Sequence, residues 1–320
     1  MKEGAILNFL RENKESFVSG EAISDDLGVS RSAVWKEIQN LRSCGYEIEA
    51  APHLGYRLLS IPDKLFQEEI SAGLSSKVIG RQILSYETLD STNDTCSKLG
   101  EQGVPEGVCV FAEHQKKGRG RLGRSWVSPK GKDILFSVLL RPLMLPAQMP
   151  RLTLVAALSV VRTIRGFTGK DLGIKWPNDI FYKNLKVGGI LTEMSAETDR
   201  VKFVVLGIGL NVNSDAKELP PRSASLREIS GKRWSRIGVA QELLRALDRD
   251  YARLKARCFE ELAAEWEEYS VTSGRRVQAT VMGRKIQGLA QGIDAEGALW
   301  IRNDSGLQER IVAGDVEMIR

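Results

Sequence analysis

Histidine, paired cysteines and long apolar runs are what this sequence lacks. Two histidines in 320 residues are too few for a metal centre built from imidazoles or for a pair of catalytic histidines. The cysteines are scattered with no CxxC pair, so we expect free thiols and neither a zinc site nor a disulfide framework. No apolar run is long enough to span a bilayer, and the charged N-terminus is unlike a signal peptide. These absences predict a cytoplasmic protein without membrane contact. The residues concerned are His53, His114, Cys44, Cys96, Cys109 and Cys258.

The composition is that of a folded protein with two or three domains. Hydrophobic residues make up 42% and charged residues 27% of the chain, which is enough apolar material for a sizeable core. The formal net charge is +5, and this small excess permits a polyanionic partner without demonstrating one. Residues 116–124 carry five cations and no acid, so this one segment accounts for the whole excess.

Residues 1–60 predict a small helical module. Ser19 and Ser30 are placed to cap two helices, and Gly28 lies in the turn between them. Helix, glycine-containing turn and helix is the plan of a helix-turn-helix. The segment YEIEAAPHLGYRLL at 46–59 predicts two short strands joined by a turn, which is the position of a wing.

The third helix of this module offers a polar face. If Val34, Ile38 and Leu41 face inward, the opposite face presents phosphate contacts and base-edge donors. The alternative is a protein-docking bundle with Trp35 as a contact residue. Residues 1–60 hold seven Lys/Arg against nine Asp/Glu, so a monomer should bind DNA weakly and a dimer with two reading helices is expected. The candidate DNA-binding residues are Ser30, Arg31, Ser32, Trp35, Lys36 and Gln39.

The rest of the chain predicts two further domains. Strongly apolar runs at 134–140 and 201–208 are typical of buried strands, and 152–164 and 239–254 are typical of helices. This alternation favours a mixed α/β domain. Beyond residue 272, short strand-like pieces separated by Gly, Asp and Asn favour a small antiparallel barrel. The strands expected there are 277–281, 287–293, 298–301 and 309–312. The predicted domains are therefore 1–62, 63–271 and 272–320.

The segment KKGRGRLGR at 116–124 is the most unusual part of the sequence. Glycine lets a backbone approach a ligand closely, and arginine supplies planar donors for phosphate or carboxylate. A flexible nucleic-acid-binding arm has a similar composition. The apolar strand expected at 108–112 and a second strand after Ser125 and Trp126 favour a loop that covers a site instead. The loop has neither the Walker A spacing nor the Rossmann fingerprint.

Three other polar segments are hard to explain by packing alone. They are DSTN at 90–93, IKWPND at 174–179 and GIGLNVN at 207–213. Lys186 joins them because it precedes Gly188 and Gly189, where small residues let a ligand approach. The plain alternatives are that Ser91 or Thr92 only caps a helix and that Lys186 is solvated surface.

The motifs STN, EHQKKGRGRLGRSW, IKWPNDI, LKVGGIL and GIGLNVN, in this order, resemble those of the biotin protein ligases. With the helix-turn-helix module in front, the whole chain is similar to the bifunctional members of that family, which also repress the biotin biosynthesis operon. The resemblance implies an α+β protein with three parts. These are a winged helix-turn-helix, a central mixed α/β catalytic domain of the biotin/lipoate ligase type and an SH3-like barrel.

The resemblance also implies the reaction. Biotin and ATP give biotinoyl-5′-AMP, and a lysine of the biotin carboxyl carrier protein, an acetyl-CoA carboxylase subunit, takes the biotin. Such chemistry needs no nucleophile on the enzyme, in keeping with the absence of a histidine-supported serine or cysteine. The family's catalytic positions correspond to Lys186, Arg121 and Arg119. With Mg²⁺ these cations would offset the repulsion between the biotin carboxylate and the α-phosphate.

The resemblance implies a larger binding set, with Trp126 over the adenine side and, with Ile190, forming an apolar wall. Mg²⁺ would come with ATP near Asp179 and not occupy a fixed protein site. The implied biotin and adenylate contacts are Ser91, Thr92, Asn93, Gln115, Gly118, Arg119, Gly120, Arg121, Trp126, Lys175, Asn178, Asp179, Lys186, Gly189, Gly207 and Asn211.

The implied partners are the carrier protein, operator DNA of biotin genes and a second copy of the chain when the adenylate is bound. Two alternatives stay open. One is a biotin-sensing repressor without catalysis, against which the intact Lys186 and GRGRLGR loop argue. The other is a lipoate or octanoate ligase-type acyltransferase, against which the same loop and KWPND argue.

Overall fold

The computed structural model describes residues 4–197, 200–281 and 283–319. The chain divides into two compact units, Met1–Lys64 and Leu65–Arg320. Within the described residues, no helix is long and apolar enough to cross a membrane. All four cysteines are free, as predicted.

The first unit is a three-helix module with a two-stranded antiparallel sheet. The side chains of Ser19 and Ser30 accept hydrogen bonds from Ala22 N and Ala33 N, so both predicted N-caps are confirmed. Gly28 ends the second helix in the left-handed region at φ 62°, a conformation that glycine adopts without strain. The elements are α1 (Ala5–Glu12), α2 (Gly20–Leu27), α3 (Arg31–Ser43), β1 (Glu47–Ala51) and β2 (Gly55–Ser60).

The two-stranded sheet is tied to the helices by Val18. Val18 exchanges backbone hydrogen bonds with Tyr56, at 2.9 and 2.8 Å. A Cβ on Gly55 would lie 2.0 Å from the Val18 carbonyl oxygen, and Gly55 has φ 106°. Only glycine fits a position that combines this φ with such close backbone contact.

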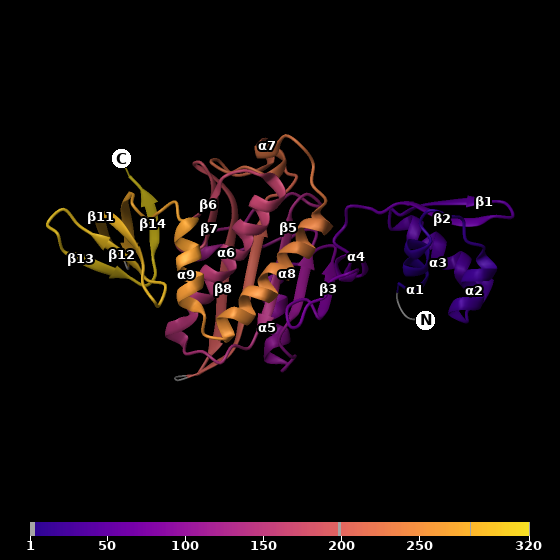
Figure 1. Cartoon of the computed structure of the whole chain (residues 1–320), viewed down its shortest axis with the longest axis horizontal. Helices are drawn as coiled ribbons and strands as arrows, with labels where there is room; N and C mark the ends of the chain where they lie inside the picture. The colour runs from indigo at the N-terminus through magenta and orange to yellow at the C-terminus, as the bar shows by residue number, and fades with distance from the viewer. Residues whose placement is uncertain (1–3, 198–199, 282, 320) are drawn as a thin grey trace. The chain divides into compact units, whose positions relative to one another are not determined.

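The second unit is built on a seven-stranded mixed sheet (Figure 1). Its order is β3-β4-β5-β9-β8-β7-β6, and β3 with β4 is its parallel pair. The mixed α/β class predicted for this part of the chain is confirmed. The strands are β3 (Gln82–Tyr86), β4 (Val108–Ala112), β5 (Ile134–Leu140), β6 (Leu172–Lys175), β7 (Asp179–Tyr182), β8 (Leu185–Ala196) and β9 (Val201–Leu210).

Helices cover both faces of this sheet. Because side chains alternate across a strand, each strand contributes residues to both cores. In β4, Cys109 and Phe111 join the main core beneath α6 and α8, whereas Val108 and Val110 pack under α5 with Phe203. Helices α6 and α8 lie side by side on the first face (Figure 1). The α-helices are α4 (Gln67–Ser71), α5 (Thr92–Glu101), α6 (Met149–Thr168), α7 (Leu226–Ser230), α8 (Arg236–Lys255) and α9 (Phe259–Glu268). Short 3₁₀ turns are η1 (Arg121–Gly123), η2 (Pro146–Gln148) and η3 (Ala216–Glu218).

The C-terminal part forms one antiparallel sheet of five strands in the order β13-β12-β11-β10-β14. The last strand was not predicted, because Val316 is the one buried side chain among its four residues. The indole nitrogen of Trp176 donates to the carbonyl of Gly297 at 3.1 Å, which joins this sheet to the segment after β6. The strands are β10 (Arg276–Val281), β11 (Arg284–Ile293), β12 (Leu299–Arg302), β13 (Gln308–Ile311) and β14 (Asp315–Met318).

One sequence-based expectation about the loop's surroundings is wrong. A strand was expected directly after Ser125 and Trp126, but β5 begins only at Ile134. Ser125 instead pairs with Arg119 within the loop itself. Local hydrogen bonding inside the loop therefore replaces pairing with the large sheet.

Candidate active site

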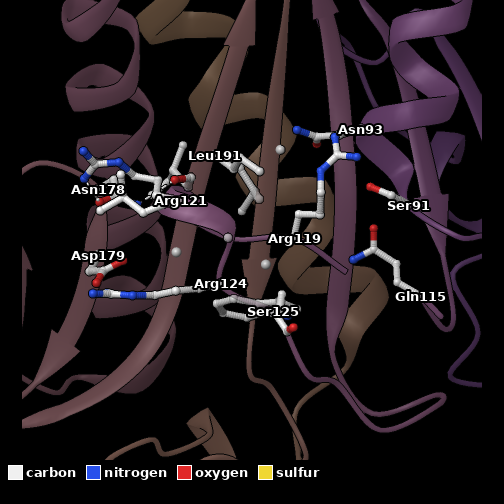
Figure 2. A pocket seen from close by; sticks show the side chains of 18 of the residues that line it. Ser91, Asn93, Gln115, Arg119, Arg121, Arg124, Ser125, Asn178, Asp179 and Leu191 are labelled. Carbon is white, nitrogen blue, oxygen red and sulfur yellow. Dashed lines mark hydrogen bonds between the residues drawn. The ribbon is translucent and has the colours of Figure 1, made fainter. Parts of the chain in front are cut away.

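One pocket gathers most of the predicted site residues (Figure 2). Its volume, including the part open to solvent, is about 810 Å³. The start of α5 lies on one side and β7 with the 174–179 segment on the other, while β8 and β9 form the floor between them. Its lining residues are Ser91, Thr92, Asn93, Gln115, Arg119, Gly120, Arg121, Leu122, Arg124, Ser125, Trp126, Asn178, Asp179, Lys186, Gly189, Ile190, Leu191, Gly207, Ile208, Gly209 and Asp315.

Three residues of the predicted binding set do not line the pocket. Gly118 lies beneath it, where a Cβ would meet the Trp126 carbonyl oxygen at 2.5 Å. Lys175 extends over the ring of Phe181, 5.4 Å from its centroid. Asn211 is buried, and its side-chain nitrogen donates to the Ala224 carbonyl at 3.2 Å. Gly118 therefore packs against the backbone of Trp126, and Asn211 binds the segment that carries Ala224.

The glycine loop is an ordered hairpin. Trp126 N donates to Gly118 O at 2.9 Å, and Gly120 N donates to Arg124 O at 2.7 Å. At the tip Leu122 has φ 55°, and the residue is 72% exposed. A left-handed backbone is unfavourable for a bulky residue, so the tip is held in place by the contacts of its neighbours.

The arginines of the hairpin supply those contacts. Arg119 pairs with Asp94 and with Glu193 of β8. Arg121 donates to Asn178 Oδ1 and to the Gly314 carbonyl, at 2.9 Å each. Burial lowers the pKa of Arg121, and the charge of Asp179 opposes that shift. The hairpin is thus anchored to the large sheet on one side and to the C-terminal sheet on the other.

Arg124 and Asp315 make a second link to the C-terminal sheet. A hydrogen bond from Arg124 to Asp315, reinforced by the opposite charges, raises the pKa of Arg124. Asp315 lies at the start of β14 and lines the pocket. The C-terminal sheet therefore contributes directly to the pocket.

Lys186 lies on the floor beside the Trp126 ring. Its ammonium group is 2.7 Å from Asp179 Oδ1 and 5.6 Å from the ring centroid of Trp126. A Cβ on Gly209 would approach Trp126 Cε2 to 2.5 Å, and one on Gly189 would lie 3.2 Å from Trp126 Cζ3. The two glycines let the indole lie directly on the sheet, where it forms an apolar wall.

The opposite side of the pocket is lined by hydroxyl and amide groups. Helix α5 begins at Thr92 with Ser91 in the N-cap position, but the Ser91 side chain makes no cap hydrogen bond. Gln115 Oε1 accepts from Thr92 N at 2.7 Å and from Thr92 Oγ1 at 3.0 Å instead. The expectation that Ser91 or Thr92 caps this helix is therefore wrong. The loop residue Gln115 does so, because its amide oxygen accepts from the Thr92 N–H, one of the free N–H groups of the first turn.

A buried ion pair lies at the root of the loop. Arg236, 1% exposed, donates to Glu113 Oε2 at 2.7 Å, and Glu113 Oε1 also accepts from Leu65 N at 2.7 Å. Beside it Asp133 is 1% exposed and accepts from Val212 N and Ser214 Oγ. Burial raises the pKa of Asp133 to about 6.

Several residues at or next to the pocket were not predicted. Leu191, Ile208, Gly209 and Asp315 line it. Glu193, Asp94 and Ser137 hold its polar side in place. Leu191, Ile208 and Gly209 lie within the motifs LKVGGIL and GIGLNVN, so those motifs could have identified them as pocket residues. The carboxylates carry no local signal, because isolated acids are common on any surface.

In the first unit the predicted DNA-binding face is on the outside of α3. Arg31, Ser32 and Lys36 are exposed, and Trp35 is 58% exposed. Arg31 forms an ion pair with Glu21 at 2.6 Å. No acid other than the half-buried Glu37 lies on α3. The face is therefore locally cationic, although the module as a whole is slightly acidic.

Ser30 and Gln39 complete the predicted face in different ways. The Ser30 hydroxyl caps α3, accepting from Ala33 N at 3.2 Å, and Gln39 is half-buried. Among the described residues, no group of three or more His, Cys, Asp or Glu side chains is arranged to hold a metal ion.

Models of known families match three parts of the chain. The biotin/lipoate A/B protein ligase family matches residues 85–211, a helix-turn-helix domain matches 3–57, and the biotin protein ligase C-terminal domain matches 272–318.

Individual proteins match over greater lengths. The bifunctional ligase/repressor BirA of Bacillus spizizenii is 39% identical over 98% of this chain and 97% of its own length. The corresponding protein of Escherichia coli is 29% identical over 94% of this chain and 93% of its own. The biotin protein ligase from Aquifex aeolicus in complex with biotin and ATP superimposes with a TM-score of 0.65 at 31% identity, covering 75% of this chain and 99% of that one.

Proposed function

The chain belongs to the biotin/lipoate protein ligase family, among its bifunctional ligase/repressors, and on that premise we propose how its pocket and its helix-turn-helix carry out the two activities. The family resemblance seen in the sequence is confirmed. The protein is a biotin protein ligase whose substrates are biotin and ATP. Its N-terminal helix-turn-helix makes it a DNA-binding repressor as well.

The observation that carries the site assignment is the two-sided chemistry of the pocket. Hydroxyl and amide groups line one side, where Arg119 is already paired with Asp94 and Glu193. Arg121, Lys186 and Asp179 line the other side. Trp126 and Ile190 supply apolar surface between them. A pocket of this kind suits a ligand with a polar ring at one end and a carboxylate at the other. We place the biotin ring near Ser91–Asn93 and Gln115, and the adenylate near Arg121, Lys186 and Asn178.

In the first half of the reaction a carboxylate oxygen of biotin attacks the α-phosphorus of ATP. The bond from that phosphorus to the bridging oxygen breaks and pyrophosphate leaves. Arg121 and Lys186 stabilise the negative charge that the two anions bring together. Such preorganised donors contribute about 3 kcal/mol each, or roughly 10²–10³ in rate. Arg119 takes part through the loop that it anchors.

In the second half the amine of a carrier lysine attacks the acyl carbon. The acyl–oxygen bond breaks, AMP leaves with its electron pair, and the amine loses its proton as the amide forms. The glycine-loop hairpin covers the mixed anhydride and keeps water away from it. The carrier is the biotin carboxyl carrier protein of acetyl-CoA carboxylase, in keeping with the names of the chain's relatives.

Mg²⁺ belongs to the proposal as an ion bound with the triphosphate. Magnesium sites of this kind use one or two protein carboxylates, with phosphate oxygens and water completing the shell. Asp179, with one oxygen beside Lys186, fits that role. When bound, the ion would polarise the phosphate oxygens and neutralise their charge.

The repressor activity rests on the cationic face of α3. We propose that Arg31, Ser32, Trp35, Lys36 and Gln39 contact operator DNA of biotin genes, with Ser30 holding the helix start. The net acidity of the module limits the phosphate attraction of a single copy. Binding therefore requires a homodimer, which the bound adenylate promotes.

The ligase site is tested by Lys186→Ala. Lys183→Ala, at an exposed position in the turn between β7 and β8, is the matched control. Biotinyl-AMP formation from biotin and ATP should fall by roughly 10²–10³ in the first variant and stay within twofold in the second. Biotin transfer to a carrier domain, with octanoate or lipoate as competitor, tests substrate choice. Near-wild-type adenylation by Lys186→Ala would remove this lysine from the mechanism.

The repressor activity is tested by DNA binding at several salt concentrations, with and without biotin and ATP. Lys36→Ala should reduce the slope of log affinity against log salt by about one for each copy bound. The exposed Lys14→Ala serves as the control and should leave the slope unchanged. An affinity that does not respond to biotin and ATP would contradict the proposed adenylate-linked dimer.

A further inference from the structure

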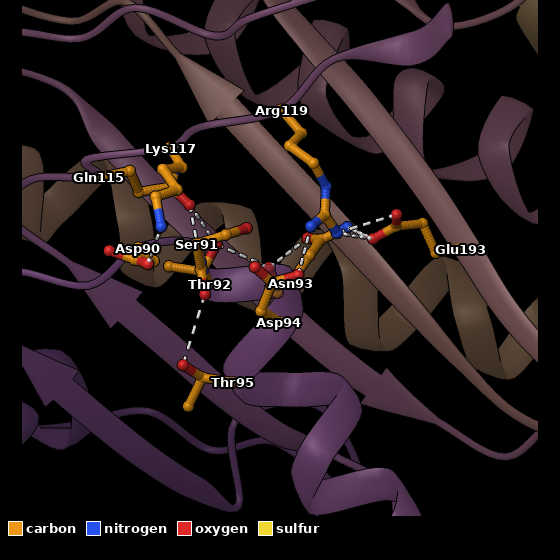
Figure 3. A network of polar contacts seen from close by, with 11 residues as sticks. Asp90, Ser91, Thr92, Asn93, Asp94, Thr95, Gln115, Lys117, Arg119 and Glu193 are labelled. Carbon is orange, nitrogen blue, oxygen red and sulfur yellow. Dashed lines mark hydrogen bonds and ion pairs between the residues drawn. The ribbon is translucent and has the colours of Figure 1, made fainter. Parts of the chain in front are cut away.

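Glu193 is a carboxylate on the pocket's polar side that none of the recognised motifs includes. It lies on β8, and its Oε2 accepts from Asn93 Nδ2 at 2.6 Å and from Arg119 Nη2 at 2.9 Å (Figure 3). Arg119 in turn pairs with Asp94 of α5. One carboxylate therefore touches both the amide beside the pocket and the arginine of the glycine loop.

The contact with Glu193 fixes how the Asn93 amide is turned. A carboxylate accepts hydrogen bonds and cannot donate one, so the Asn93 nitrogen must face it. The amide oxygen then faces Ser137 Oγ, 2.6 Å away. Gly207 makes the space for this arrangement, because a Cβ there would lie 2.1 Å from Asn93 Oδ1.

The chain of contacts continues to the loop. Ser137 Oγ, which is fully buried, also lies 2.8 Å from Thr92 Oγ1. Thr92 Oγ1 is 3.0 Å from Gln115 Oε1. Glu193 is thus connected through Asn93, Ser137 and Thr92 to Gln115, which lies four residues before Arg119. Arg119 closes the ring by returning to Glu193.

The hydrogens of this ring do not suffice for all its contacts. Ser137 and Thr92 each have one hydroxyl hydrogen, whereas three close contacts join Asn93 Oδ1, the two hydroxyls and Gln115 Oε1. If the Asn93 amide were turned over, its nitrogen would supply the missing hydrogen. Glu193 opposes that turn, because the amide oxygen would then face a carboxylate.

We propose that Glu193 is a positioning residue for biotin binding: it holds the Asn93 amide in the orientation that leaves an acceptor on Asn93 or Thr92 for a donor of the substrate. This rests on the proposed function, in which biotin occupies this side of the pocket. The second contact of Glu193, with Arg119, holds the glycine loop over the same side of the pocket. Glu193, which does not line the pocket, therefore decides which donors and acceptors Asn93, Thr92 and Gln115 present to a ligand.

The test begins with Glu193→Gln, which keeps the shape of the side chain and adds a donor. Its amide can donate to Asn93 Oδ1, so the Asn93 amide turns over and the acceptor is lost. The KM for biotin should rise about tenfold, the value of one hydrogen bond, while the KM for ATP stays within twofold. The exposed Glu197→Gln, near the end of the same strand, should change neither.

Asp94→Asn separates the two contacts of Glu193. It loosens Arg119 but leaves the link from Glu193 to Asn93 intact, so its biotin KM should rise less than threefold. Equal increases in Glu193→Gln and Asp94→Asn would overturn the proposal, because the effect would then pass through the loop and not through Asn93.

A double-mutant cycle tests whether the chain transmits the effect. Ser137→Ala breaks the chain at a residue with no contact to Glu193 among the described interactions. Each single variant should raise the biotin KM about tenfold, and the double variant also about tenfold, because both break one chain. A hundredfold increase in the double variant would overturn the proposal.

A measurement without ligand keeps this inference distinct from the proposed function. Selective ¹⁵N-asparagine labelling reports the Asn93 side-chain amide, identified by its loss in Asn93→Asp. Its signal should move in Glu193→Gln and much less in Asp94→Asn; no movement in Glu193→Gln would overturn the proposal. If the wild-type protein did not ligate biotin, the proposed function would fail, but the amide signal would still decide the role of Glu193.

Discussion

A methyl group added at Gly207 should damage the side of the pocket proposed to bind biotin and leave the side proposed for the nucleotide intact. The new Cβ would lie 2.1 Å from Asn93 Oδ1, whereas ordinary contacts begin near 3.4 Å. The oxygen must therefore retreat by more than 1 Å. Asn93 is 4% exposed and bonded at 2.6 Å to both Ser137 and Glu193, so it cannot retreat without breaking these bonds.

The cost follows from the two bonds. A neutral hydrogen bond contributes about 1 kcal/mol and one to a charged group about 1.5–3 kcal/mol, so Gly207→Ala should lower the free energy of unfolding by about 2–4 kcal/mol. The melting temperature should fall by about 5–10 °C. Since Asn93 is displaced, the KM for biotin should rise at least tenfold, while the KM for ATP changes little.

Two other glycines supply the comparison. Gly209→Ala, two residues along the same strand, would meet Trp126 Cε2 at 2.5 Å, so its effect should fall on the KM for ATP. Gly166→Ala in α6 has nothing within 4 Å of its Cβ and should be neutral or stabilising by up to about 1 kcal/mol. Adenylation kinetics and thermal melting measure all three. A biotin KM within twofold of wild type and an unchanged melting temperature in Gly207→Ala would refute the reasoning.

Three further predictions concern charged groups around the site. Arg236→Met leaves Glu113 buried without its cation and should destabilise the second unit by about 3–5 kcal/mol in denaturant unfolding; adding Glu113→Gln should recover part of that loss. Burial raises the pKa of Asp133 from 3.8 to about 6, so its ionisation opposes folding. Relative to Asp133→Asn, the free energy of unfolding of the wild type should fall by about 3 kcal/mol as pH rises from about 3 to 7, at about 1.4 kcal/mol per pKa unit. Parallel curves of stability against pH for the two proteins would contradict this. Asp315→Asn removes a pair in which Arg124 is 64% exposed, so thermal melting should register a loss below about 1 kcal/mol, and a larger loss would mean that the two sheets depend on this contact.

The helices of the first unit were predictable because their signals are local. Ser19, Gly28 and Ser30 act on residues within one helical turn, and the structure shows each acting as expected. The same logic failed at α5, where Ser91 occupies the N-cap position without capping. Gln115 does the capping by accepting from Thr92 N, 23 residues away, and no local pattern could indicate that.

The short strand β14 shows a second limit. Strand periodicity needs several buried side chains, and Asp315–Met318 has one. Its importance comes from its position, since Asp315 and the Gly314 carbonyl bind the loop arginines. A segment with little pattern of its own therefore became part of the pocket through the packing of the C-terminal sheet.

The motifs, which are residue types at fixed spacings along the chain, indicated the family, and that resemblance implied the reaction. The sequence by itself also located the excess charge of +5 in residues 116–124. Only the tertiary structure decided what those cations face. Arg119 meets Asp94 and Glu193, 25 and 74 residues away, and Arg124 meets Asp315, 191 residues away. Such partners are set by the order of strands in the sheets, which short-range periodicity and capping do not encode.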